Sequence, residues 1–449
     1  MSRKKWALLI ILLLLVWGYI HFFYKTYSPT AVTKSADCVI AIDVKKITNT
    51  IIWNFITTPG QWNTGNVFKS GTKVISWKDM VKLPDYILPF HVKDQPVNAW
   101  YVLLTIKDEA DFAKGLLQYQ FVKINTNEYI STASGMHFYQ YGNKILVANA
   151  AVANKNLLSI VAEELFEKKI FLPAEKLSKL IDAKSHTAIL VAANNFLQQD
   201  ALVTANFNKQ QIEIKSTIIP QKEFSFTENN FNYNPGSLCS LGFTQPSPRI
   251  YSLLSDGVKK NISALLNFNI DSLLLPANKY YQLDVSGIQQ RTDSAISYSF
   301  DEDFNKVENV VVNNLQEPAF DFTITGDSVV KIYRHWQQSN KLETAPGGEI
   351  FTAIPFVKSY CNLTGVNELK ITSSNYQQSQ AEKKQQSILF LNVLLSKIPA
   401  DLFKYFPTYF SNTMGNIDQM EAGVKKINDQ IIFNCLLTKK KSDLPIIKF

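Results

Sequence analysis

Two acidic clusters are the residues best suited by type to general acid–base chemistry. The first is Asp108-Glu109, and the second is Asp301-Glu302-Asp303. A pair of carboxylates flanking a scissile bond is the arrangement of a glycan hydrolase, in which Asp301 and Glu302 would act as acid and base. No second functional group lies beside either cluster in the sequence. We therefore expect Asp108 and Asp301 to cap helices.

Serine, histidine and cysteine patterns do not complete a catalytic or metal site. Ser70-Gly71-Thr72-Lys73 fits the S-x-x-K pattern of a nucleophilic serine, but the K-T-G that should accompany it is missing. The five histidines include no HExxH. The four cysteines have no CxxC spacing. We expect free, buried thiols, and disulfides in a translocated domain are the alternative. We predict no catalytic residue, no metal and no cofactor, and therefore no enzyme.

A cluster of tryptophans is the strongest hint of binding. Trp53, Trp62, Trp77 and Trp100 fall in one short stretch. Trp62 lies among glycine and asparagine residues, which makes it the ring most exposed to a ligand such as a sugar or a lipid. The alternative is packing in the core and loops. We take Trp62 as a tentative ligand contact.

The elements that position these residues begin with an apolar N-terminal stretch. Residues 6–23 carry no formal charge and follow the basic residues Arg3-Lys4-Lys5, and we predict a transmembrane anchor over 6–24 after a cytoplasmic tail over 1–5. Its anchoring residues are Trp6, Leu12, Trp17 and Phe22. The basic tail favours a single-pass protein with the N-terminus cytoplasmic and the bulk periplasmic or extracytoplasmic. A cleaved signal peptide and a buried helix are the alternatives.

Composition sets the class of the remaining chain. Hydrophobic residues make up 46% and charged residues 19% of 449 residues, which indicates globular domains. The net charge of +8 is scattered, so we predict no nucleic-acid partner. The run Lys439-Lys440-Lys441 is typical of a solvated tail, and contact with anionic headgroups is its alternative.

Along the chain, apolar runs alternate with turn residues. We predict a tether over 25–36, a first domain over 37–225, a linker over 226–237 and a second domain over 238–449. Strands are expected at 36–44, 99–106 and 187–193, and helices at 45–55 and 154–169. Hairpins are expected at 136–150, 201–219, 319–335 and 421–435.

An internal match suggests that the two domains are duplicates. Thr105–Gln118 and Ser299–Val311 share a strand end, then D-E, then D-F-x-K, with Ala110 as a one-residue insertion. We expect a helix after each, anchored on a sheet by Phe112 and Phe304. Further downstream, Thr187–Asn195 is similar to Gln386–Leu394 in the same order. The alternative is that short strand–helix units look alike by composition.

The layout resembles uncharacterised bacterial envelope proteins that carry a duplicated α+β domain of unknown function behind a membrane anchor. The residues that carry the resemblance are the anchor, the strand at 36–44, Asp85–Val92 and the segment Lys107–Lys114. The fold class predicted is α+β, with an N-terminal transmembrane helix and two related antiparallel-sheet domains with packed helices. The predicted function is a non-catalytic, membrane-anchored extracytoplasmic protein that binds or scaffolds in the envelope.

The partners expected on this reading are membrane lipid, through the anchor, and another envelope protein. Two other functions stay open in the sequence. One is a glycan or cell-wall hydrolase. The other is a carrier of lipid or another hydrophobic ligand, in a groove between the two halves.

Overall fold

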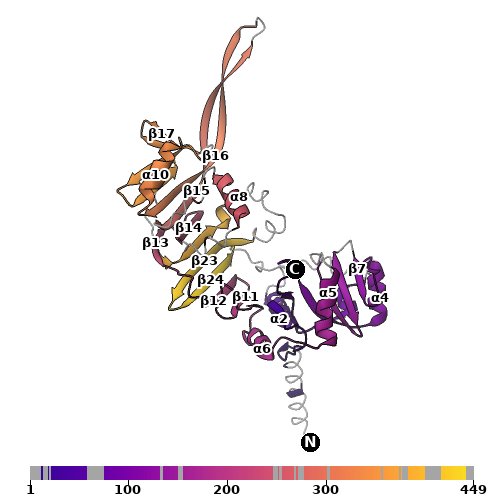
Figure 1. Cartoon of the computed structure of the whole chain (residues 1–449). Helices are drawn as coiled ribbons and strands as arrows, with labels where there is room; N and C mark the ends of the chain where they lie inside the picture. The colour runs from indigo at the N-terminus through magenta and orange to yellow at the C-terminus, as the bar shows by residue number, and fades with distance from the viewer. Residues whose placement is uncertain are drawn as a thin grey trace, which may run out of the picture. The chain divides into compact units, whose positions relative to one another are not determined.

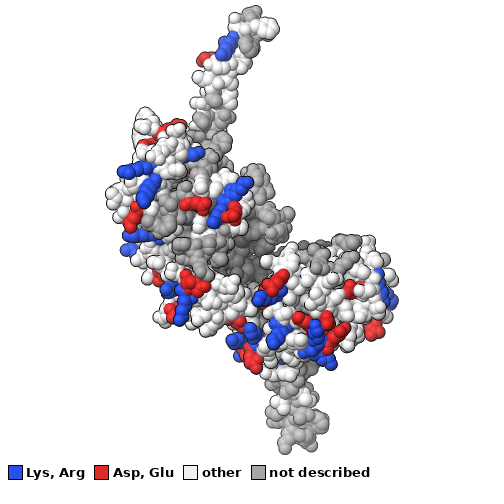
Figure 2. Space-filling view, in the orientation of Figure 1, with Lys and Arg blue, Asp and Glu red and all other residues white. Residues whose placement is uncertain are grey.

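The computed structural model describes most of the chain in separate stretches. These are residues 22–57, 75–131, 135–149, 155–245, 255–266, 278–300, 304–354, 357–373, 383–399 and 416–440, with isolated positions elsewhere. The chain divides into two compact units, one over residues 1–219 with 442–449 and the other over 220–441. Figure 1 shows the elements, and Figure 2 shows basic and acidic side chains interspersed on the visible face of each unit.

An antiparallel sheet forms the centre of the first unit. Strand β1 (Ala36–Asp43) pairs along one edge with β10 (Thr187–Val191), and β11 (Ala201–Phe207) and β12 (Gln211–Ile218) continue the sheet from there. The other edge of β1 pairs with β3 (Tyr86–Ile87) and β4 (Phe90–Val92). From β4 the order continues through β5 (Tyr101–Ile106), β9 (Lys144–Ala148), β8 (Met136–Tyr141), β7 (Glu128–Ser131) and β6 (Val122–Lys123), and β2 (Val81–Lys82) also pairs with β5.

Short helices accompany this sheet, and all of them except α2 contribute buried residues to two apolar clusters. The helices are α2 (Val44–Thr57), α3 (Trp77–Met80), α4 (Glu109–Gln118), α5 (Lys155–Ala162) with the π-helical turn η3 (Glu163–Glu167), and α6 (Ala174–Asp182). In the larger cluster, Leu158 of α5 and Leu177 of α6 pack with Phe90 of the sheet. In the smaller one, Phe112 of α4 packs with the sheet residue Phe138. These clusters fix the helices because their apolar residues recur at helical spacing.

The second unit is also built on antiparallel strands. Strand β14 (Cys239–Thr244) lies between β15 (Asn278–Phe300) and β22 (Leu389–Leu394), and β23 (Ile417–Ile427) and β24 (Gln430–Lys439) extend the sheet beyond β22. On the other side, β15 pairs with β16 (Lys306–Gly326), followed by β20 (Glu368–Ser373), β19 (Ser359–Thr364), β18 (Gly348–Phe351) and β17 (Leu342–Ala345).

One helix and a small sheet complete the apolar packing of the second unit. Helix α10 (Val329–Gln338) buries Val329, Ile332 and Trp336, which recur at helical spacing, against β16, β19 and β20. A two-stranded sheet of β13 (Asn229–Tyr233) and β21 (Lys383–Ser387) falls partly within the predicted linker. The remaining elements are α8 (Asp256–Leu266) and the 3-10 turn η4 (Leu395–Lys397).

The predicted fold class is wrong. Of the described residues 48% lie in strands and only 22% in helices, so the chain is mostly antiparallel sheet and not a pair of related α+β domains with packed helices. The main cause is the second acidic cluster, where we expected a helix after residue 303. The chain instead forms the paired strands β15 and β16, and the predicted hairpin over 319–335 is the end of β16 followed by α10.

The predicted anchor and the single-pass topology drawn from it are contradicted as well. Among the residues that the structure describes, no helix combines the length and apolarity needed to cross a membrane. Of the predicted anchor the structure describes only a few positions, among them Leu12 and Leu13, and both of these side chains are exposed. Trp6 and Trp17 lie outside the described residues. The predicted localisation, a single-pass membrane protein with its bulk periplasmic or extracytoplasmic, rested on this anchor and is therefore not supported.

The predicted tether over 25–36 is packed on the first unit. Val32 is fully buried in the larger apolar cluster, and its carbonyl accepts a hydrogen bond from the Leu172 backbone N–H at 2.9 Å. Nearby, the backbone N–H of Thr26 donates to Asp85 at 2.8 Å. Burial of Val32 offsets the entropy lost in ordering these residues. The chain therefore runs from residue 25 directly into the fold.

Candidate functional site

The candidate site is organised around the start of helix α2. Asp43, the last residue of β1, is 1% exposed and accepts a hydrogen bond from the Lys46 backbone N–H at 2.7 Å, which caps the helix. Its other carboxylate oxygen forms an ion pair with Lys25. The cap and the ion pair offset the cost of burying the carboxylate. Together they fix the first turn of α2 against the sheet and against residue 25.

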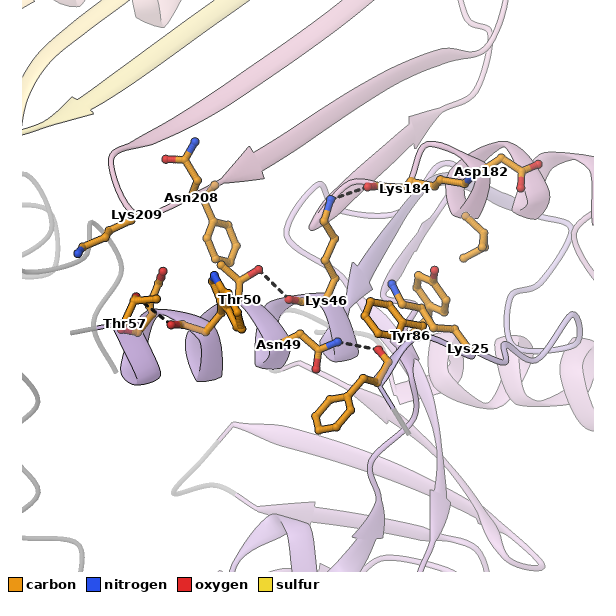
Figure 3. A pocket seen from close by; sticks show the side chains of 16 residues that line it. Lys25, Lys46, Asn49, Thr50, Thr57, Tyr86, Asp182, Lys184, Asn208 and Lys209 are labelled. Carbon is orange, nitrogen blue, oxygen red and sulfur yellow. Dashed lines mark hydrogen bonds between the residues drawn. The ribbon is translucent and has the colours of Figure 1, made fainter. Parts of the chain in front are cut away.

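One face of α2 forms a wall of a pocket that has a volume of about 1010 Å³. The wall residues recur at helical spacing and are Lys46, Asn49, Thr50, Trp53, Asn54 and Thr57. Figure 3 shows this face opposite the turn that carries Asn208 and Lys209. We call this cavity the α2 pocket. Its volume lies at the upper end of the range typical of small-molecule sites.

Aromatic rings supply most of the apolar lining of the α2 pocket. Phe22 and Phe23 come from the chain before β1, Tyr86 from β3 and Phe207 from the end of β11. Trp53 lines the pocket from α2 and is still 67% exposed. An exposed tryptophan at the wall of a cavity is an unusual position for so large a ring, since burial would be favourable. The pocket therefore presents apolar surface to solvent.

A buried histidine holds α2 against the sheet beneath the pocket. The ring of His186 stacks on Phe207, with the centroids 3.9 Å apart. His186 Nδ1 accepts from the Phe207 backbone N–H at 3.3 Å, so Nε2 carries the proton and donates to Thr50 Oγ1 at 2.9 Å. Burial, with Lys46 nearby, lowers the pKa of His186 to about 4. The imidazole is therefore neutral at physiological pH and serves as a fixed bridge.

Positive charge dominates the polar lining. The pocket contains four lysines, Lys25, Lys46, Lys184 and Lys209, and one acid, Asp182. The ammonium of Lys46 donates to the Lys184 carbonyl at 2.6 Å (Figure 3). It also donates to Asn206 Oδ1 at 3.1 Å. Burial lowers the pKa of Lys46, only partly opposed by Asp43. An anion bound beside Lys46 would favour its charged form, so the site is electrostatically suited to an acidic group.

A smaller pocket in the second unit has the opposite character. It has a volume of about 170 Å³ and is lined by polar groups, including Asp284 and Asp321, which face each other across β15 and β16. Asp284 is already held by Ser240 at 2.6 Å, Ser237 at 2.9 Å and Tyr376 at 3.0 Å. Within the described stretches, no group of three or more metal-ligating side chains comes together. These hydroxyl donors explain the buried carboxylate without any ligand.

Of the functional residues predicted from the sequence, some line the α2 pocket, some lie elsewhere and others are not described. Phe22, predicted as an anchor residue, lines the α2 pocket, whereas Leu12 is exposed and contacts no described pocket. Trp62, Ser70, Asp301 and Glu302 lie outside the described residues. Among the clustered tryptophans, Trp77 stacks on Tyr119 in the core, and Trp53 is the one that lines the cavity.

Sequence reasoning missed the lysines of the α2 pocket and the role of His186. Lys46, Lys184 and Lys209 are far apart in the sequence, and no local spacing links them. One usable signal was the spacing of residues in helix α2. Asn49, Trp53 and Thr57 are four residues apart, so they lie on the same face of the helix. A tryptophan on an otherwise polar helix face is a mark of a binding surface.

Comparisons with known proteins add little. No family model matches the chain, and no curated protein matches it. Two solved structures, titled crystal form III and crystal form I of TP0453, are each 10% identical with a TM-score of 0.28. They cover 54% and 44% of this chain, and 88% and 80% of their own. A likeness this weak carries no argument about fold or function. The resemblance to uncharacterised envelope proteins is not tested by it and stays a prediction.

Proposed function

We propose that this chain is a binding protein whose first unit takes up an amphipathic ligand with an acidic group in the α2 pocket. The observation that carries the proposal is the lining of that pocket: aromatic rings on its walls, and four lysines against one acid. The acidic group would lie near Lys46 and Lys184, and the apolar part against Trp53 and Phe207.

The lysines and the aromatic rings of the pocket together disfavour a ligand that is only charged or only apolar. A small inorganic anion would use the lysines but leave the rings of Trp53 and Phe207 in water, where covering them is favourable by about 25 cal/mol per Å². A neutral hydrocarbon would cover the rings but leave the partly buried Lys46 with only Asp43, whose charge does not fully offset the effect of burial. A long-chain carboxylic acid satisfies both requirements.

The proposal assigns His186 a structural role. Both of its ring nitrogens are engaged, with Phe207 and with Thr50. Its low pKa also makes it a weak base. It would thus hold the wall of the pocket in place without transferring a proton.

Calorimetric titration of the full chain with oleate tests the proposal. We expect saturable binding of one oleate, weaker binding of the uncharged oleyl alcohol, and no measurable heat with acetate. Trp53→Ala should weaken oleate binding at least tenfold, because it removes the largest exposed ring of the wall. A paired Lys184→Gln and Lys209→Gln variant should weaken oleate and leave oleyl alcohol unchanged.

Lys114→Gln is the matched control, since Lys114 is an exposed lysine of α4 that does not line the pocket. Its oleate affinity should equal that of the unmodified chain. Equal oleate affinity in Trp53→Ala would overturn the proposal, and so would the absence of saturable oleate binding.

A further inference from the structure

The feature that the α2 pocket does not account for is a long two-stranded arm in the second unit. Strands β15 and β16 stay paired from Asn278 with Gly326 to Phe300 with Lys306. Figure 1 shows the outer part of this ribbon extending beyond the rest of the second unit. Strand β16 pairs with β20 only over Asp321–Thr325. Among the described strands, the outer edge of β16 from Lys306 onward therefore has no neighbour.

One face of the arm exposes several apolar side chains next to the charged Glu308 and Lys306. Ile296 and Val310 lie directly opposite each other and are 60% and 67% exposed. Tyr298 and Val312 share this face, because residues two apart on a strand point the same way. Figure 2 shows few charged side chains among the described residues of the arm on the visible side. An isolated two-stranded ribbon is only marginally stable in water, and an open edge is a template for another strand.

The sequence of this open edge is complementary to itself. Residues 304–310 read F-N-K-V-E-N-V. In an antiparallel pairing centred on Val307, Lys306 of one copy lies opposite Glu308 of the other, and the same pair forms again across the axis. Asn305 lies opposite Asn309. When two copies of this stretch run antiparallel, opposite charges therefore face each other and amides face amides.

We propose that the outer edge of β16 pairs antiparallel with the same edge of a second copy of this chain, with a two-fold axis at Val307. Because β16 begins at Lys306, the two strands pair over residues 306–308 of each copy, and there they join the two ribbons into four neighbouring strands. The pairing is isologous, as most dimer contacts are. Each Lys306 gains an acidic partner, and within the described residues Glu308 has no cationic partner in its own chain.

The charges of Lys306 and Glu308 favour the axis at Val307 over axes farther along β16. Moving the axis to Asn309 would place Lys306 opposite Val312 and Glu308 opposite Val310, which leaves both charges facing apolar side chains. Moving it to Val311 would pair Val310 with Val312 but leave both charges facing amides. Opposite charges directly across an antiparallel pair are stabilising, so the axis at Val307 is the register that satisfies both.

A cysteine placed on the axis tests the geometry. Val307→Cys in the full chain should form a disulfide-linked dimer under mild oxidation, because directly opposed residues have Cα atoms about 4.5–5.5 Å apart. Val311→Cys is the matched control on the same face. Its two copies would be separated by eight residue steps, about 26 Å, which no disulfide spans. The natural cysteines Cys361 and Cys435 are buried and should not cross-link.

A charge exchange tests the pairing without a covalent bond. In sedimentation velocity at low salt, Lys306→Glu and Glu308→Lys should each weaken the dimer about tenfold, because each creates two repulsive contacts. The double variant should restore the dimer to within about threefold. Failure of Val307→Cys to link, equal linking of Val311→Cys, or a double variant no tighter than the single ones would overturn the proposal. Neither experiment depends on the α2 pocket.

Discussion

The two segments that match in sequence fold into different structures. Asp108 caps helix α4 by accepting the Asp111 backbone N–H at 2.9 Å, and Phe112 of that helix is 3% exposed. In the second segment, Phe304 is 85% exposed with a left-handed φ of 61°, and Lys306 begins strand β16. The same run of residue types makes a packed helix in one unit and the end of an exposed arm in the other.

The difference lies in the residues that follow the match. Four residues after Phe112 comes the buried Leu116, so the first segment has an apolar stripe at helical spacing. Four residues after Phe304 comes Glu308, and the run Val310–Val312 then favours a strand. Phe112 also meets the sheet residue Phe138, whereas nothing in the described part of the second unit covers Phe304. The match therefore no longer supports a duplication.

The largest expected effect comes from removing the two matched phenylalanines. Phe112→Ala should lower the unfolding free energy of the first unit by about 3–5 kcal/mol, because it opens a cavity in the core. Phe304→Ala should change that of the second unit by less than about 0.5 kcal/mol. Hydrogen exchange of peptides from each unit measures both. Similar losses from the two variants would break the comparison.

A second contrast concerns the residue before the matched strands, His186 in one unit and Gln385 in the other. Because the folded pKa of His186, about 4, lies below its unfolded value of 6.5, the unfolded chain binds more protons between these pH values. The stabilisation is complete above pH 6.5 and is lost as the pH falls towards 4, by roughly 3 kcal/mol. The neighbouring charges are Lys46, Asp43 and Lys25.

His186→Gln should flatten this pH dependence in the first unit. Urea midpoints between pH 4 and 7, followed by hydrogen exchange of β10 peptides, provide the measurement. Peptides of β22 in the second unit serve as the internal reference. An unchanged slope in the variant would show that His186 is not the titrating group.

The third prediction concerns the position that follows the matched lysines. Gly115 of α4 corresponds to Val307 of the arm, and a Cβ at Gly115 would collide with the Met80 side chain. Gly115→Ala should therefore cost the first unit about 1–3 kcal/mol, although alanine is the better helix former. Thermal melts of Gly115→Ala and of Met80→Leu measure the two effects separately. The first variant adds a methyl group to the packed contact, and the second changes only the side chain on the other side of that contact. Stabilisation by Gly115→Ala would contradict the packing argument.

The smallest effect should come from the helix cap. Asp108→Ala removes the side-chain acceptor for the Asp111 N–H and should cost about 1 kcal/mol. Asp108→Asn keeps an acceptor and should cost clearly less. Thermal unfolding of the two variants measures the difference. Equal losses would mean that the carboxylate charge, and not the cap hydrogen bond, stabilises α4.

Local patterns predicted several elements correctly. The hairpin of β8 and β9, the hairpin of β11 and β12 and that of β23 and β24 are confirmed, as is helix α2. In each hairpin a short polar turn joins two strands, as at Gly142 with its φ of 56°. Such elements depend on contacts a few residues apart, so the sequence contains the information that specifies them.

What the sequence by itself determined about this protein is therefore its local elements: where helix α2 begins, where strands turn, and which residues can cap or pack. Tertiary structure alone decided three things. It buried Val32 of the supposed tether, brought Lys184 and Phe207 to the face of α2, and left Phe304 at the end of an arm. The physical reason is that burial and desolvation depend on partners distant in the chain, and a match of five residue types does not specify those partners.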